Sequence, residues 1–379
     1  MKVVISKADL LKTLIVASRS MLSKANLPIL SNILIDASGG KLEVVTTNLE
    51  TAVKASVKCQ VDAEGKVTVP GKVFLEYVSQ IPEGEILLEK LGEEVVVSTK
   101  GYNARFATMP SEEFPAIPKI TGGKLLNIDS QKFLDSVTKV SFAAAQDESR
   151  PVLSGVFVEF NKKGMIMVAT DGYRLSYNET VVEAGEGLSG LGLVIPAKSI
   201  VEASKIIGEA GEEGGKVTVV VAENLSQVNF KIGEVEFTSR LIEGEFPAWQ
   251  KIIPTNFATK AVVPKQDFIN VVRAASIFAR ESGSIVKLKL EPGKNGQGSL
   301  GLSAATAQVG SGDAQVSTQL DGKGGEIAFN FRYLLEALSV IGGEDVVFEM
   351  NESLNPGRMT STDPKDKFFH IVMPVRLQG

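Results

Sequence analysis

The stretch KADLLKTLIVASR (residues 7–19) has two counterparts further along the chain, SQKFLDSVTKVSFAA (130–144) and KQDFINVVRAASIFAR (265–280). In each stretch apolar residues recur four apart, as in the pairs Leu10 and Leu14, Phe133 and Val137, and Phe268 and Val272. This spacing is typical of one face of an amphipathic helix. The sequence therefore predicts three related helices, each with one buried face.

Two further sets of segments follow these helices in the same order. The second set is VPGKVFLEYVSQIP (69–82), IPAKSIVEASKIIG (195–208) and FNFRYLLEALSVIG (329–342), and each member reads as a helix entered from a strand. The third set is RFATMPSEEFP (105–115), FTSRLIEGEFP (237–247) and FFHIVMPVRL (368–377), in which Met109, Leu241 and Met373 follow one another at intervals of 132 residues. Three markers repeated three times predict a triplicated domain.

Short Val- and Ile-rich runs between the helical segments predict strands, for example KLEVVTT, EVVVST, GVFVEF and KVTVVVA. Each repeat then has two helices and about eight antiparallel strands, which is an α+β domain. Segments with Pro, Gly or Asn at 119–127 and 252–262 are the expected linkers. We therefore expect domains at residues 1–122, 126–253 and 258–379.

Composition limits the classes of protein that fit. The chain has 379 residues, 44% of them hydrophobic, and a net charge of −5, so it can bury ample core. It holds no apolar run long enough to span a membrane, and its start, MKVVISKADLL, does not resemble a signal peptide. The single cysteine, Cys59, rules out an internal disulfide and fits a reducing cytoplasm.

Few residues are suited to catalysis. The one histidine, His370, sits in the apolar run FFHIVMP, where we expect a structural role, and it lies far in sequence from Cys59. A His/Cys metal site is therefore excluded, and we expect no metal, no cofactor and no catalytic residue. The stretch GEAGEEGGKV (208–217) lacks the spacing of a phosphate-binding loop and carries three glutamates. In ATDGYRLSYNE (169–179), Asp171 and Gly172 are interpreted as a turn.

Basic residues recur seven apart on the first helix of each repeat, away from the apolar anchors. The pairs are Lys12 and Arg19, Lys132 and Lys139, and Arg273 and Arg280, and the second helices add Lys198, Lys205 and Arg332. A solvated helix face explains one such pair, whereas three copies favour a built basic surface. We expect this surface to contact phosphates of a polyanion without regard to base sequence.

The whole chain resembles the family of bacterial DNA polymerase III β subunits, the replication sliding clamps. The residues that carry the resemblance are LPILSN (27–32), DESRPVLSGV (147–156), ATDGYRL (169–175), VIPAKS (194–199), the FP-containing domain ends, EIAFNFRYLLEAL (326–338) and VMPVRL (372–377). The resemblance implies a head-to-tail homodimer that closes a ring of six domains around double-stranded DNA and gives the polymerase processivity. It also adds Lys24 and Arg150 to the DNA-facing residues.

The family binds short peptides of its partners in a hydrophobic pocket, so the resemblance implies such a pocket here. Its partners are the replicative polymerase, the clamp loader and other proteins with a clamp-binding motif. The matching positions are Leu153, Thr170, Gly172, Tyr173, Arg174, Leu175, Pro247, Lys251, Ile252, Asn330, Tyr333, Leu354, Pro356, Ile371, Val372, Met373, Pro374, Val375, Arg376 and Leu377. We expect Leu, Val and Met to form its apolar walls and Arg174 and Arg376 to hold peptide oxygens. Tyr173 and Trp249 stand where His and Tyr are common.

Ring closure would join the first domain of one chain to the third domain of the other. Ile277 and Phe278 are candidate interface residues, with a place in the core as the alternative. Two other classes stay open: an enzyme with an unmarked carboxylate site, and a DNA-binding scaffold that forms no ring. A ring stays on closed circular DNA at high salt and leaves cut DNA, whereas an electrostatic binder leaves both.

Overall fold

The computed structural model describes residues 1–22, 26–117, 120, 123–147, 149–161, 164–182, 190–210, 215–281, 283–306 and 310–376. The two helices expected in each repeat lie within these ranges: α1 (Lys7–Ala17), α2 (Gly71–Gln80), α3 (Ser130–Val140), α4 (Ala197–Ala210), α5 (Lys265–Ala279) and α6 (Phe331–Val340). The anchors Leu10, Phe133 and Phe268 are each at most 1% exposed, so the predicted buried faces are confirmed. None of the described helices is long and apolar enough to cross a membrane.

The strands of the described residues follow the repeats. The first repeat holds β1 (Lys2–Ser6), β2 (Asn32–Ser38), β3 (Lys41–Thr47), β4 (Thr51–Lys58), β5 (Gln60–Ala63), β6 (Gly65–Pro70), β7 (Glu85–Leu91), β8 (Glu94–Thr99) and β9 (Tyr102–Ala107). The second holds β10 (Lys124–Asp129), β11 (Gly155–Asn161), β12 (Gly164–Thr170), β13 (Arg174–Thr180), β14 (Leu191–Pro196), β15 (Lys216–Val221), β16 (Gln227–Ile232) and β17 (Val235–Arg240). The third holds β18 (Thr259–Pro264), β19 (Ile285–Pro292), β20 (Gln297–Thr306), β21 (Gly310–Gly322), β22 (Gly325–Asn330), β23 (Asp345–Met350), β24 (Gly357–Ser361) and β25 (Phe369–Val372).

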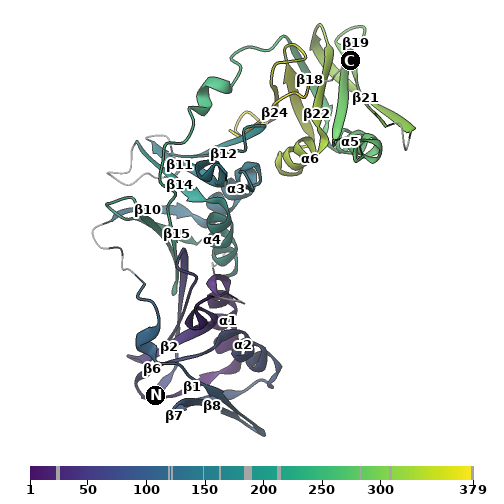
Figure 1. Cartoon of the computed structure of the whole chain (residues 1–379). Helices are drawn as coiled ribbons and strands as arrows, with labels where there is room; N and C mark the ends of the chain where they lie inside the picture. The colour runs from purple at the N-terminus through teal and green to yellow at the C-terminus, as the bar shows by residue number, and fades with distance from the viewer. Residues whose placement is uncertain are drawn as a thin grey trace. The chain divides into compact units, whose positions relative to one another are not determined.

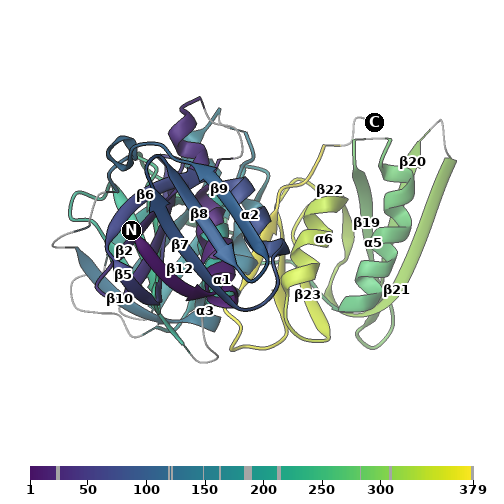
Figure 2. The same cartoon turned by 90° about the horizontal axis from the view of Figure 1, so that it is seen from below.

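Helices begin where strands end, as the sequence predicts. Strand β6 runs into α2, β14 into α4 and β22 into α6 (Figure 1). The Ser6 hydroxyl oxygen caps α1 by accepting from the Asp9 backbone N–H at 3.1 Å, and the Asn330 side chain caps α6 by accepting from the Arg332 N–H at 3.0 Å. In the third repeat α5 and α6 lie side by side on the sheet (Figure 2), where Phe268 of α5 and Leu334 of α6 enter the core.

Residue contacts divide the chain into two compact units, and the division runs through the second repeat. The first unit holds the described residues of 1–134 and 198–241, with a five-stranded sheet β5-β1-β7-β8-β9 and an eight-stranded sheet β10-β15-β16-β17-β4-β3-β2-β6. The second unit holds those of 135–182, 190–197 and 242–376, with a twelve-stranded sheet β14-β11-β12-β13-β25-β24-β23-β18-β21-β20-β19-β22. The neighbouring strands run antiparallel, which agrees with the expected α+β class.

Each unit contains one place where strands of two successive repeats pair. In the first unit β17 pairs with β4, for example Phe237 with Val53, and we call this pairing the first seam. In the second unit β13 pairs with β25, for example Leu175 with Ile371, and we call this the second seam. Both seams join the last strand of one repeat to the second strand of a hairpin, β3-β4 or β12-β13, in the repeat before it. Backbone ladders thus tie successive repeats together.

Candidate peptide-binding and DNA-facing sites

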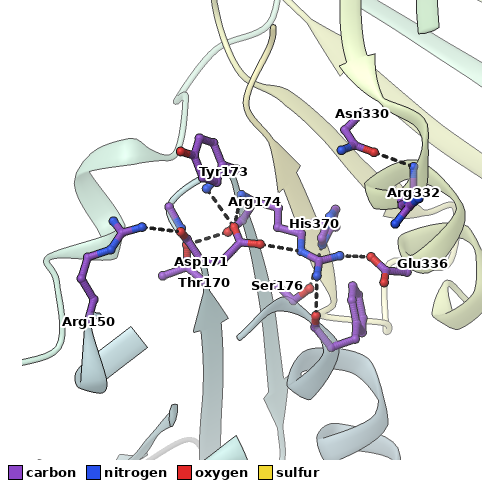
Figure 3. A network of polar contacts seen from close by, with 12 residues as sticks. Arg150, Thr170, Asp171, Tyr173, Arg174, Ser176, Asn330, Arg332, Glu336 and His370 are labelled. Carbon is purple, nitrogen blue, oxygen red and sulfur yellow. Dashed lines mark hydrogen bonds and ion pairs between the residues drawn. The ribbon is translucent and has the colours of Figure 1, made fainter. Parts of the chain in front are cut away.

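The segment 170–175 forms a tight turn between β12 and β13 (Figure 3). One oxygen of Asp171 (Oδ1) accepts from the backbone N–H of Tyr173 at 2.8 Å and of Arg174 at 3.0 Å. The Thr170 hydroxyl accepts from the Gly172 N–H at 3.0 Å and donates to the Arg174 carbonyl at 2.5 Å. Gly172 has φ +90°, a conformation that favours glycine. The expected turn role of Asp171 and Gly172 is confirmed.

Arg174 lies beneath this turn and is only 5% exposed. Its Nε donates to Asp171 Oδ2 at 3.1 Å, its Nη2 donates to the Phe142 carbonyl at 2.7 Å, and its Nη1 donates to the Glu336 carboxylate on α6. Its guanidinium carbon also lies 4.4 Å from the centre of the Tyr333 ring, a cation–π contact. Three of its five N–H groups are thus engaged within the protein, and the expected contact with a peptide oxygen stays a prediction.

The second seam brings the two expected walls of the pocket together. Arg174 pairs with Val372, and the Met373 N–H donates to the Tyr173 carbonyl at 2.8 Å. About two hundred residues of sequence separate these segments, so their contact confirms the expectation that they meet in space. Beyond the strand, the Val375 N–H donates to the Ala328 carbonyl of β22 at 2.8 Å. The chain after β25 therefore runs from the turn of the second repeat to a strand of the third.

Exposure sorts the expected pocket residues into three groups. The exposed residues are Gly172, Tyr173, Pro247, Lys251, Ile252, Leu354 and Arg376. The half-buried ones are Asn330, Tyr333, Pro356, Met373, Pro374 and Val375. The buried ones are Leu153, Thr170, Arg174, Leu175, Ile371 and Val372, and Leu377 lies outside the described residues. The exposed and half-buried groups are the ones that can touch a ligand.

Leu175 is fully buried rather than part of a surface wall. It packs with Val168, Trp249 and Ile371 in a cluster to which aromatic side chains such as Tyr177 and Phe369 are added. The Tyr177 ring lies 5.2 Å from that of Trp249 and 4.5 Å from that of Phe369. Leu175, which was expected among the apolar walls of the pocket, therefore lies in the core below the turn and supports it.

His370 is fully buried in the second seam, opposite Ser176. Its Nδ1 is hydrogen-bonded to the Ser176 hydroxyl at 2.7 Å, while its Nε2 has no partner among the described residues. Burial, with a smaller effect of the nearby Arg174 charge, lowers the pKa of His370 to about 3, so the ring is neutral at physiological pH. With no acid on Nε2 and no exposure, this Ser–His pair matches the structural role expected for His370.

Most of the expected DNA-facing residues are exposed. They are Lys12, Lys132, Arg150, Lys198, Lys205, Arg273, Arg280 and Arg332, whereas Lys24 lies outside the described residues. Arg150 also donates from Nη2 to the Asp171 carbonyl at 3.3 Å, which links it to the turn. Lys205 pairs with Glu202 on its own helix at 2.6 Å. Exposure is the property that a phosphate contact requires, and these residues have it.

Two of the expected cations are not part of a freely solvated helix face. Helix α1 ends at Ala17, so Arg19 lies in the following 3₁₀ turn, where it pairs with Glu202 at 3.3 Å and with Glu209. Lys139 is 22% exposed and pairs with Asp366 at 2.7 Å, with the Phe368 ring nearby. Arg19 and Lys139 therefore do not lie on a freely solvated helix face, because folding brings acids from distant segments beside them, and their contact with DNA stays a prediction.

The two candidate interface residues differ in environment. Ile277 on α5 is 57% exposed, whereas Phe278 is half-buried and packs against the core of the third repeat. The Phe278 ring lies over Gly312 of β21 so closely that a Cβ at that position would collide with it. Ile277 is thus available to a partner, and Phe278 supports the strand beside it.

Sequence reasoning missed Phe142 and Glu336, whose oxygens accept hydrogen bonds from the Arg174 guanidinium. Neither has a local signal, because Phe142 contributes only its backbone carbonyl and Glu336 is an acid on an ordinary helix. The aromatic cluster around Trp249 was also missed. It takes Phe157 from β11, Tyr177 from β13 and Phe369 from β25, so no pattern along a single strand marked it.

Three consecutive domains, each with a pair of helices on antiparallel sheets, define the DNA clamp fold. Sequence profiles of the DNA polymerase III beta subunit match the chain in three parts: the N-terminal domain at residues 1–118, the central domain at 127–248 and the C-terminal domain at 250–376. The chain belongs to the DNA polymerase III beta subunit family.

Relatives of full length agree with this assignment. The chain is 29% identical to the beta sliding clamp of Synechocystis sp. over 397 residues and 30% identical to that of Caulobacter vibrioides over 387 residues, with 100% of each chain covered. Crystal structures of the DNA polymerase III beta subunit from Thermotoga maritima and Pseudomonas aeruginosa match it with TM-scores of 0.91 and 0.93. They are 28% and 27% identical to it, and 100% of each chain is covered.

Proposed function

We propose that two copies of this chain close head to tail into a ring around double-stranded DNA, and that the ring tethers a replicative polymerase. The clamp gives processivity and has no catalytic activity of its own. The observation that supports ring closure is that two strands of the kinds that form the seams remain at sheet edges. Each seam pairs the last strand of one repeat with a hairpin strand of another, and one strand of each kind is left over.

The strands left over are β9 and the first part of β21. Among the described residues β9 pairs only with β8, and residues 310–318 of β21 pair only with β20. Strand β9 is the last strand of the first repeat, as β17 is of the second. Strand β21 follows β20 in the third repeat, as β4 follows β3 in the first. An unpaired edge strand is a template for another chain. Because the two edges differ, their pairing is heterologous and must close by rotation to avoid a filament.

Apolar residues accompany both edges. Tyr102 of β9 is 47% exposed and Val73 of α2 is 56% exposed, while Ile277 beside β21 is 57% exposed. Burying such side chains between two copies would stabilise the dimer by about 1.5–3 kcal/mol for each one fully buried. Backbone pairing sets the register, and these residues add affinity.

DNA binding rests on the exposed cations of α1, α3, α4, α5 and α6, together with Arg150. Their contacts would be to phosphates, so the ring can move along any sequence. The overall charge of −5 then favours contact through this one surface and not through the rest of the protein. The single Cys59 cannot form an internal disulfide, which fits the cytoplasm that we propose as the location of the protein.

Partner peptides would bind at the second seam. The exposed Tyr173 and Ile252 and the half-buried Met373 supply adaptable apolar contacts around the turn, and Leu354 and Arg376 extend them. The polymerase, the clamp loader and other proteins with a clamp-binding motif would compete for this place, with one site in each chain. No membrane contact is part of this function.

Ring formation predicts a native mass of twice 40.4 kDa at micromolar concentration. After loading onto DNA, the dimer should stay on closed circles at high salt and leave them when the DNA is cut. Replacing Ile277 with Asp should yield monomers, because it buries a charge in the interface. Light scattering measures the masses of the parent and of the variant. Gel filtration of the loaded DNA measures retention on closed and cut circles. A stable monomer, or loss from closed circles at high salt, would support a scaffold that forms no ring.

If the peptide site lies here, replacing both Ile252 and Met373 with Ala should lower the affinity for a peptide that has a Gln anchor and a Leu-x-Phe end. Two buried apolar side chains of the peptide contribute about 3–6 kcal/mol before ordering costs, so the loss should be about tenfold to a hundredfold. Leu225→Ala, at an exposed apolar residue outside the second seam, is the control and should have no effect. Unchanged binding of the double variant in calorimetry would place the peptide elsewhere.

A further inference from the structure

The second helices of the three repeats carry a glutamate at the same position. The segments VPGKVFLE (69–76), IPAKSIVE (195–202) and FNFRYLLE (329–336) end at Glu76, Glu202 and Glu336. These glutamates belong to α2, α4 and α6. Three equivalent helices thus present a carboxylate at one place, and its surroundings can be compared between the repeats.

Two of these glutamates bind an arginine of the preceding repeat. Glu202 accepts from Nη1 of Arg19 at 3.3 Å, and Arg19 belongs to the first repeat. Glu336 accepts from Nη1 of Arg174, which belongs to the second repeat (Figure 3). The side chains of Arg19 and Arg174 are 25% and 5% exposed, so protein shields both arginines in part from solvent. The glutamate therefore marks a point where one repeat holds the next.

Both arginines are placed by the end of the first helix of their repeat. Arg19 and Phe142 stand at the same position, nine residues after the apolar anchors of the first and second repeats. Arg19 supplies its own guanidinium there, whereas the Phe142 carbonyl accepts from Nη2 of Arg174 at 2.7 Å. The third repeat has Ile277 at this position. The end of α5, which contains Ile277, is thus the place where the third repeat would supply its cation.

The third glutamate, Glu76, has no such arginine. It is exposed and forms no ion pair within the described part of the chain. Val73 lies three residues earlier on the same face of α2 and is 56% exposed. At the position of Val73, α6 has Tyr333, which is half-buried and contacts Arg174 of the second repeat. The face that a neighbouring repeat covers on α6 is therefore open on α2.

The third repeat has a cation that matches this open face. Strands β20 and β21 contain no lysine or arginine, so a cation beside them comes from α5, which packs on both. Arg280 directly follows α5 with helical backbone angles, as Arg19 closely follows α1. It is exposed and forms no ion pair with the residues that the structure describes. Because Arg280 lies three residues after the exposed Ile277, the two share one face.

We propose that Arg280 of one chain pairs with Glu76 of a second copy, and that this ion pair helps to select the head-to-tail partner. Ile277 and Val73 meet beside it, so that apolar faces apolar and positive faces negative. The inference rests on the proposed ring, in which the first repeat of one chain meets the third repeat of the other. A ring of two chains contains the pair twice. Arg280, which was expected to face DNA, then faces the partner.

The test reverses each charge in the full-length protein and measures the dissociation constant of the dimer by analytical ultracentrifugation. Glu76→Arg alone and Arg280→Glu alone should each raise this constant about tenfold to a hundredfold, because like charges then meet at both interfaces. A mixture of the two variants should assemble nearly as well as the parent, since one interface then holds the reversed pair and the other the natural pair. The weakening should fade in about 1 M salt, which screens exposed charges. Glu223→Arg, at an exposed glutamate outside the helices, is the matched control and should have no effect.

Four outcomes would overturn this ion pair. Dimers of both single variants as tight as those of the parent would remove the pair and leave the ring in place. Weakened variants whose mixture stays weak would show that the two residues do not face each other. Tight dimers of Arg280→Glu with a lower affinity for duplex DNA would return Arg280 to the DNA-facing residues. A monomeric parent would overturn the ring itself, and the pair with it.

Discussion

Replacing Arg174 with alanine should lower the free energy of unfolding by about 3–5 kcal/mol, because it removes one partner of a buried ion pair. The Arg174 side chain is 5% exposed, and the Asp171 side chain that it pairs with is 16% exposed. Without the guanidinium, Asp171 loses its counter-charge and the Phe142 carbonyl loses its donor. The turn of the second repeat also loses its connection to α6 in the third. Chemical denaturation monitored by the fluorescence of Trp249, the only tryptophan, measures the change.

Two control variants separate the causes. Arg174→Lys keeps the charge but cannot reach three acceptors at once, so it should recover only a small part of the loss. Glu336→Gln should cost less than about 1 kcal/mol, because Glu336 is 44% exposed and its pair with Arg174 is screened by solvent. A loss below about 1 kcal/mol for Arg174→Ala would contradict the structural role and return this residue to the candidates for ligand binding.

The triplication could be predicted from the sequence because its markers are local. The helices need only the four-residue spacing of residues such as Phe268 and Val272, and the strands need only short Val- and Ile-rich runs. The 132-residue interval of Met109, Leu241 and Met373 then relates the repeats without any knowledge of their packing. The turn at Asp171 and Gly172 was predictable for the same reason, because its hydrogen bonds span three residues.

What could not be predicted is the environment that depends on distant segments. Leu175 and Arg174 are successive residues of one strand, and both are buried: Leu175 packs against Trp249, and Arg174 binds Glu336 of α6. No local pattern marks such a strand. Arg19 and Lys139 have the spacing of a solvated face, yet each has a distant acidic partner. Glu202 lies 183 residues from Arg19, and Asp366 lies 227 residues from Lys139. Spacing along one helix cannot reveal such partners.

These pairs also decide which cations should be reversed to test DNA binding. Lys139 is unsuitable, because a glutamate there would face Asp366 and unfold the site for reasons unrelated to DNA. Lys12 of α1, Lys198 of α4 and Arg273 of α5 are exposed and come from helices of all three repeats. Changing these three to Glu should leave the fold intact, which the unfolding curve checks.

The triple variant should bind linear duplex DNA much more weakly than the parent, and its affinity should depend less on salt. Each phosphate that the protein no longer neutralises lowers the steepness of log affinity against log salt by about 0.9, so three such phosphates lower it by about three units. Fluorescence anisotropy of a labelled duplex over a range of salt concentrations measures both quantities. The weakening should be the same for any base sequence, because interactions with phosphate carry no sequence information.

The matched control is Lys58→Glu, Lys100→Glu and Lys294→Glu, at exposed lysines outside the helices. Three reversals change the net charge by six units in both variants, from −5 to −11, so a general repulsion of DNA would weaken both equally. A selective weakening in the helix variant would locate the DNA on the surface that the three repeats share. Equal weakening would show that this surface is only a solvated face. An unchanged dependence of affinity on salt would show that Lys12, Lys198 and Arg273 do not contact phosphate.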